Sequence, residues 1–233
     1  MEQGTYKGDV LQKIAGLSFI VGTIVLVVFG LLHPAEDLGD LRATIQNVAD
    51  SNGGFFEIDH ILIALAFWAL LIGIVGVYRS ISLGSASAWV RLGLYGMIIA
   101  TTLRSVFLAI DGVGLAMVVE QWEGATGADK ATIFVTFSAL EGMLDGLRSM
   151  TDIFYGVALV LLGVGIALSS VYPKWLGWVI FVAGILWTVI GFVIGVAGSS
   201  SDLDIPFAIA FLLTVVWHLV MGIVITRREI QAM

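Results

Sequence analysis

The stretch IFYGVALVLLGVGIALS, residues 153–169, decides the fold class because it runs for 17 positions without a charged residue. Backbone groups in lipid must be paired within the segment, so a run of this kind forms a helix that spans a membrane. The preceding residues, EGMLDGLRSMTD (141–152), carry four charges at steps of four, three and four. This spacing places Glu141, Asp145, Arg148 and Asp152 on one helical face, which continues the span beyond the hydrocarbon edge.

The composition of the whole chain is that of a membrane protein. Of 233 residues, 59% are hydrophobic and 12% are charged, and the mean hydropathy is +1.02. A soluble domain contains about 25% charged residues. The net charge of −7 argues against nucleic acid as a partner, and the absence of cysteine excludes disulfides and thiolate ligands.

Turn signals rich in Gly, Pro, Asn and Ser divide the chain into six apolar segments, at about 11–32, 57–78, 89–117, 132–171, 175–197 and 205–226. The first is too long for a signal-peptide core, so we expect a retained span. We therefore predict an all-α membrane protein, with residues 1–233 forming a single bundle of six transmembrane helices. Within the long connection 33–56, the segment DLRATIQNVAD (40–50) predicts a short amphipathic helix at the membrane interface.

The distribution of charge predicts that both termini are cytoplasmic and that the protein lies in the cell membrane. Seven of the eleven Lys and Arg residues fall on the side of the termini: Lys7, Lys13, Arg79, Arg91, Lys174, Arg227 and Arg228. The opposite side carries Arg42 and Lys130 with eleven carboxylates: Glu36, Asp37, Asp40, Asp50, Glu57, Asp59, Glu120, Glu123, Asp129, Asp202 and Asp204. Cytoplasmic loops are the ones enriched in Lys and Arg.

Depth counting predicts a pair of salt bridges between the third and fourth spans. At about 1.5 Å per residue, Arg104 and Asp152 reach one level and Asp111 and Arg148 another. An unpaired charge at this depth costs several kcal/mol, so we expect Arg104 to pair with Asp152 and Asp111 with Arg148. The network is either a structural clip or a charge relay or ligand site.

Close approach between helices is expected at Gly191-x-x-x-Gly195 and Gly142-x-x-x-Gly146.

A second group of polar side chains is expected at the outer ends of the spans, where it is either solvated or binds a partner or a divalent cation. Its members are Glu57, Asp59, His60, His33, Glu141 and Asp145. Histidine with carboxylates suits zinc, and oxygen ligands suit calcium. No other cofactor is predicted.

His218 lies apart from these residues, in the cytoplasmic half of the sixth span beside Trp217. A second histidine for haem is lacking at that depth. We expect a buried, hydrogen-bonded histidine, with a proton relay as the alternative.

Motifs for nucleophilic catalysis, nucleotide binding and zinc hydrolysis are missing: the chain has no GxSxG, P-loop, dinucleotide fingerprint, HExxH or EF-hand loop. The leading hypothesis is an accessory or binding membrane protein with an acidic outer face, partnered by lipid and by other subunits or further copies of itself. One alternative is an ion-coupled transporter that uses Arg104, Asp111, Arg148 and Asp152. Another is a metal-dependent hydrolase that uses His33, His60, Glu141 and Asp145. A cavity at the level of Arg104 and Asp152 would favour the alternatives.

The layout of the chain resembles that of the DUF4386 family of small six-span prokaryotic membrane proteins. The similarity is carried by KIAGLSFIVGTI (13–24), TTLRSVFLAID (101–111), LRSMTDIFYGVALVLLGVGIAL (147–168) and YPKWLGWVIFVAGILW (172–187). Its markers are Arg104, Arg148 and the segment from Pro173 to Gly177. The resemblance implies a six-span fold in a bacterial or archaeal membrane and implies no activity.

Overall fold

A computed structural model describes residues 10–33, 40–51 and 54–231, with side chains as far as residue 227. Within these residues every regular element is a helix. Of the charges that predict the orientation, Lys7, Glu36, Asp37 and the side chain of Arg228 lie outside the described part.

The prediction of six spans is confirmed, because six helices are long and apolar enough to cross a membrane. They are α1 (Val10–Leu32), α3 (Phe55–Ser80), the continuous rod of α4 (Gly84–Leu108), η1 (Ala109–Gly114) and α5 (Leu115–Gly124), α6 (Gly127–Leu168), α7 (Lys174–Ala197) and α8 (Asp204–Gln231), which follows the short turn η2 (Ser201–Leu203). The connection between α1 and α3 contains α2 (Leu41–Asp50), capped by the carboxylate of Asp40, which accepts from the backbone N–H of Arg42 at 2.8 Å.

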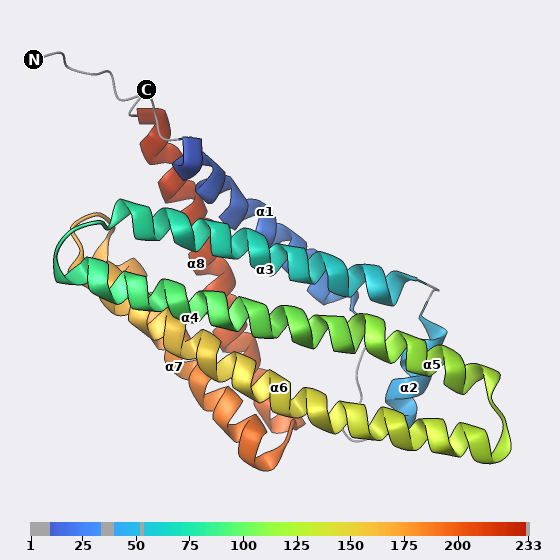
Figure 1. Ribbon diagram of the computed structural model, residues 1–233. Coiled ribbons are helices and arrows are strands. Elements are labelled where there is room, and N and C mark those ends of the chain that lie inside the picture. The colour runs from blue at the N-terminus through green and yellow to red at the C-terminus, as the bar shows by residue number, and fades with distance from the viewer. Residues whose placement is uncertain (1–9, 34–39, 52–53, 232–233) are drawn as a thin grey trace, which may run out of the picture.

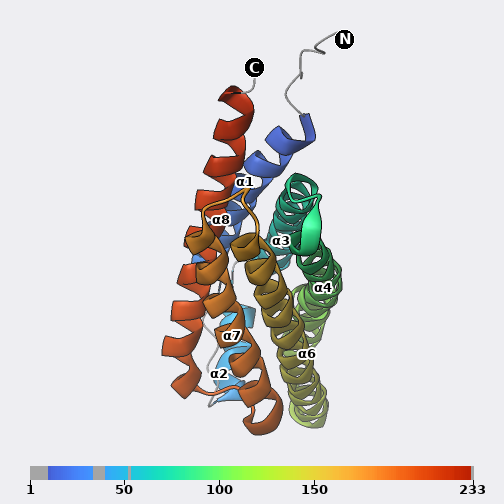
Figure 2. The ribbon, with the colours of Figure 1, turned by 90° about the vertical axis from the view of Figure 1, so that its left-hand side faces the viewer.

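The helices form one bundle in which α6 packs mainly against α7 and α4, and α1 packs against α3 and α8 (Figures 1 and 2). The start of α1 and the end of α8 lie at the same end of the bundle, called here the termini end, and α2 marks the opposite end, called the α2 end (Figure 1). The central core contains large, fully buried side chains such as Phe19, Leu159, Leu162 and Trp217.

Two of the spans are far longer than a membrane requires. The α6 helix has 42 residues, so it is about 63 Å long, roughly twice the thickness of the hydrocarbon core. The α4–η1–α5 rod runs beside it, and both project past α7 at the α2 end (Figure 1).

The residues between the apolar segments 89–117 and 132–171 are mostly helical, because α5 ends only at Gly124 and α6 already begins at Gly127. Leu115, Val119 and Trp122 of α5 bury a second apolar cluster with Ile45 of α2 and Phe137 of α6. This burial stabilises α5 as a helix up to Gly124. The chain then reverses direction at Ala125 and Thr126, followed by Gly127 at φ +57°.

Candidate functional site

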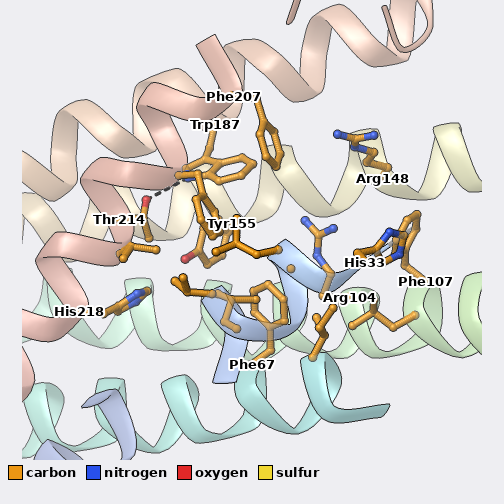
Figure 3. Close-up of a pocket in the computed structure, with 18 of the residues that line it drawn as sticks. His33, Phe67, Arg104, Phe107, Arg148, Tyr155, Trp187, Phe207, Thr214 and His218 are labelled. Carbon is orange, nitrogen blue, oxygen red and sulfur yellow. Dashed lines mark hydrogen bonds between the residues drawn. The ribbon is translucent and has the colours of Figure 1, made fainter. Parts of the chain in front are cut away.

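A cavity of about 340 Å³ lies inside the bundle, at the low end of the usual volume range of ligand sites (Figure 3). Aromatic side chains from five helices form much of its wall: Phe67, Phe107, Tyr155, Trp187, Phe207 and Phe211. Trp187 donates to the hydroxyl of Thr214 at 3.0 Å, so its ring is held in place. Polar groups are gathered at two ends, with Arg104, Arg148 and His33 at one and His218 at the other (Figure 3).

The cavity exists because α1 and α8 are close at the termini end and run apart from there (Figure 1). A Cβ atom on Gly16 would lie 2.9 Å from the carbonyl oxygen of Gly222, so the two backbones almost touch at that point. Further along, Leu26 and Gly30 of α1 and Phe211 of α8 line the cavity. The space between the diverging helices is thus lined by apolar groups from both.

Arg104 of α4 forms an ion pair with Asp152 of α6, as the depth argument predicts. The Asp152 side chain is fully buried, and the Arg104 side chain is 16% exposed. The guanidinium also lies 5.4 Å from the ring centres of Phe67 and Phe107, within cation–π range. The pair carries no net charge, so it leaves the wall of the cavity neutral at this point.

The predicted ion pair between Asp111 and Arg148 is wrong. Among the described residues no ion pair joins them, and Asp111 instead lies 3.3 Å from Nε2 of His60. The cause is η1, a π-helical segment that includes Asp111. The prediction assumed 3.6 residues per turn over the whole helix, whereas a π-helical turn inserts a residue and rotates the side chains that follow.

Arg148 borders a cavity and does not pair with the carboxylate of Asp111. Its guanidinium lies 5.5 Å from the ring centre of Phe207, and no carboxylate of the described residues is within ion-pair distance. It borders the main cavity and two neighbouring cavities, one of them about 270 Å³ in volume. A positive charge therefore faces the open space of the bundle.

His33, Asp59 and His60 come together where the ends of α1 and α3 meet η1. One ligand atom from each lies within 4.8 Å of the others. Nε2 of His33 is 3.2 Å from Nε2 of His60, and His60 Nδ1 bonds the carbonyl oxygen of Phe56 at 2.7 Å. The close approach of η1 requires Gly112, because a Cβ atom there would lie 2.3 Å from the Cβ of His60.

The other acidic residues predicted for this group lie elsewhere, which corrects the six-residue set. Glu141 and Asp145 line the neighbouring cavity of about 270 Å³, where Asp145 accepts a hydrogen bond from the hydroxyl of Ser199. Glu57 lines a further cavity beside α2 and α5. Its side chain leaves α3 in another direction because Glu57 and Asp59 are two residues apart on a helix.

The expectation of a hydrogen-bonded His218 is wrong. Its ring is fully buried against Phe19 and Trp217, with ring centres 5.2 Å and 5.3 Å away. Neither ring nitrogen has a hydrogen-bond partner in the described part of the chain, and the residue lines the deep end of the cavity. Sequence reasoning also missed Tyr155, Trp187 and Phe207, which look like ordinary apolar residues of a span until five helices place them around one space.

The comparisons with known proteins show no relative: no protein-family model, no curated protein and no solved structure matches the chain.

Proposed function

We propose that this protein is an integral membrane binding protein whose ligand is an anionic amphiphile held inside the bundle. The observation that carries the proposal is the cavity bordered by Arg148, a cation with no carboxylate partner among the described residues. A protein that only docks to other subunits needs no such space. The aromatic wall suits an apolar body, and Arg148 suits a carboxylate or phosphate group.

The ligand would lie along the cavity with its anionic group at the arginine end. Arg104 is already paired with Asp152, and Asp111, which also lines the cavity, lies beside His60, so Arg148 supplies the cationic group that has no ion-pair partner among the described residues. At the other end, the unpartnered nitrogens of His218 can hydrogen-bond a polar group of the ligand. Charge-assisted hydrogen bonds are about twice as strong as neutral ones, so we expect Arg148 to dominate selectivity.

The test is binding of a fluorescent long-chain carboxylate and of its uncharged methyl ester to the protein purified in detergent. We expect wild type to prefer the carboxylate. Arg148→Gln should weaken carboxylate binding about 10-fold or more, because a hydrogen bond to a charged group contributes about 1.5–3 kcal/mol. Ester binding should change little.

The control is Arg91→Gln, which removes an exposed arginine at the termini end. This variant should bind both probes as wild type does. Equal affinity of wild type for the acid and the ester, or an Arg148→Gln variant that keeps the preference, would contradict the proposal.

Transport is a second candidate, favoured by one observation. The main cavity and its neighbour of about 270 Å³ share Phe107, Asp111 and Arg148 as lining residues. A ligand could pass between the two cavities beside Asp111 and Arg148. Both residues belong to the charge network that the sequence predicts for a transporter. Accumulation of the same carboxylate probe in proteoliposomes would separate transport from binding alone.

The orientation supported by the distribution of Lys and Arg is one with the termini in the cytoplasm and the α2 end outside the cell. Because the chain has no cysteine, each introduced cysteine is unique. We expect a membrane-impermeant maleimide to label Thr126→Cys on intact cells and Ser85→Cys only after permeabilisation. Both positions are exposed, at opposite ends of the bundle, and the reverse pattern of labelling would invert the orientation.

A further inference from the structure

The group formed by His33, Asp59 and His60 contains a buried carboxylate that lacks the hydrogen bonds such a group needs. Asp59 is fully buried, and neither of its oxygens has a hydrogen-bond partner in the described residues. Its Oδ2 atom lies 3.9 Å from Nδ1 of His60, beyond hydrogen-bond distance. Leaving a charged group buried without partners is strongly unfavourable, so this arrangement calls for a positive charge.

We propose that His33, Asp59 and His60, with Asp111 beside them, form a binding site for one zinc ion. The ligand atoms of the first three already lie within 4.8 Å of one another, and Asp111 Oδ2 is 3.3 Å from His60 Nε2. The proposal does not depend on the nature of the ligand in the cavity.

The hydrogen bond at His60 Nδ1 sets the direction of its other nitrogen. The carbonyl oxygen of Phe56 can only accept, so Nδ1 carries the hydrogen and donates it at 2.7 Å. In a neutral imidazole, Nε2 then presents a lone pair to His33 and Asp111. A backbone carbonyl that orients the imidazole in this way is the usual outer partner of a zinc-bound histidine.

Two neighbours approach His60 Nε2 closely, and a second proton on the ring, placed at Nε2, could serve only one of them. The distances are 3.2 Å to His33 Nε2 and 3.3 Å to Asp111 Oδ2. Zinc binds nitrogen and oxygen at about 2.0–2.2 Å, so tetrahedral ligand atoms are about 3.3–3.5 Å apart. The two observed separations agree with that spacing, and a ligand atom of Asp59 lies within 4.8 Å of a ligand atom of each histidine.

Charge balance and ligand chemistry both favour a divalent, borderline-soft ion. The buried carboxylates Asp59 and Asp111 carry two negative charges against two imidazoles that are neutral as metal ligands. A zinc ion cancels this charge. Calcium and magnesium prefer sites made wholly of oxygen, whereas two imidazoles with carboxylates suit zinc.

The test is zinc binding by the full-length protein in detergent after removal of bound metal with a chelator. We expect one zinc per chain by elemental analysis, and cobalt(II) should give the absorption bands of tetrahedral coordination. Asp59→Asn and His60→Ala should each weaken zinc binding at least about 100-fold, because even loss of an outer partner costs 10–100-fold.

The matched control is Glu57→Gln, which removes a carboxylate of the same helix that lines another cavity. It should bind zinc as wild type does. Asp59→Asn separates loss of the site from loss of folding: without metal it should unfold at or above the wild-type temperature, because an unpaired buried charge is gone. Added zinc should then raise the unfolding temperature of wild type and leave that of Asp59→Asn unchanged.

Two results would overturn the site. One is wild-type protein that takes up no zinc and shows no cobalt bands, which would mean that a proton on His60 balances the cluster. The other is an Asp59→Asn variant that binds zinc as tightly as wild type.

Discussion

Asp152→Asn is expected to lower the free energy of unfolding by about 3–5 kcal/mol, because it leaves Arg104 without the carboxylate that neutralises it. The Asp152 side chain is fully buried, and the pair joins α4 to α6 in the interior of the bundle. The side chain of Arg104 is only 16% exposed, so contact with solvent compensates little for the loss of the carboxylate. Unfolding of the purified protein by sodium dodecyl sulfate in mixed micelles measures the loss.

The double variant Arg104→Leu with Asp152→Leu distinguishes charge from packing. Replacing both members of a buried pair with apolar residues is often neutral or stabilising, so we expect recovery to near the wild-type value. Asp129→Asn, an exposed change in the first turn of the same helix, should cost less than about 1 kcal/mol. A double variant as unstable as Asp152→Asn would show that the loss comes from packing and not from the unpaired charge.

Gly184→Val is expected to destabilise the bundle by about 3 kcal/mol or more, or to prevent folding, because α7 meets α6 there backbone to backbone. A Cβ atom on Gly184 would lie 2.6 Å from the carbonyl oxygen of Gly156 and 2.7 Å from the amide nitrogen of Val160. Neither backbone atom can withdraw as a flexible side chain could, so the helices would have to separate. The yield of folded monomer and the unfolding midpoint report this effect.

The matched control is Gly146→Val on α6, where a Cβ atom meets nothing within 4 Å. Since this glycine is exposed, we expect a change within about 0.5 kcal/mol. If both variants lost stability equally, helix propensity and not close packing would be the explanation.

The two Gly-x-x-x-Gly motifs show how far such a pattern can be interpreted from sequence alone. Gly191 and Gly195 pack closely on Ser149 of α6, as their spacing predicts, whereas Gly142 and Gly146 have the same spacing and contact nothing. Small residues four apart permit close approach, but the partner helix decides whether it occurs. The spacing alone cannot distinguish the two cases.

The contacts of the candidate site could be predicted only where the residues lie on regular α-helices. Arg104 and Asp152 were matched by depth because α4 and α6 are regular up to those residues. Asp111 lies beyond that point in η1, and its partner is His60 in place of Arg148. The sequence contains no marker of a π-helical turn, whose formation depends on how η1 packs against α3.

The amino-acid sequence by itself determined the all-α class and the six spans, because long apolar runs must satisfy their backbone groups as helices in lipid. Tertiary structure alone decided what Arg148, His218 and the residues around His60 face. Divergence of α1 from α8 opened the cavity beside Arg148, and the seating of His60 on Gly112 brought His33 and Asp59 together. Hydrophobicity acts on each segment separately, whereas a cavity or a cluster depends on the crossing of several helices at once.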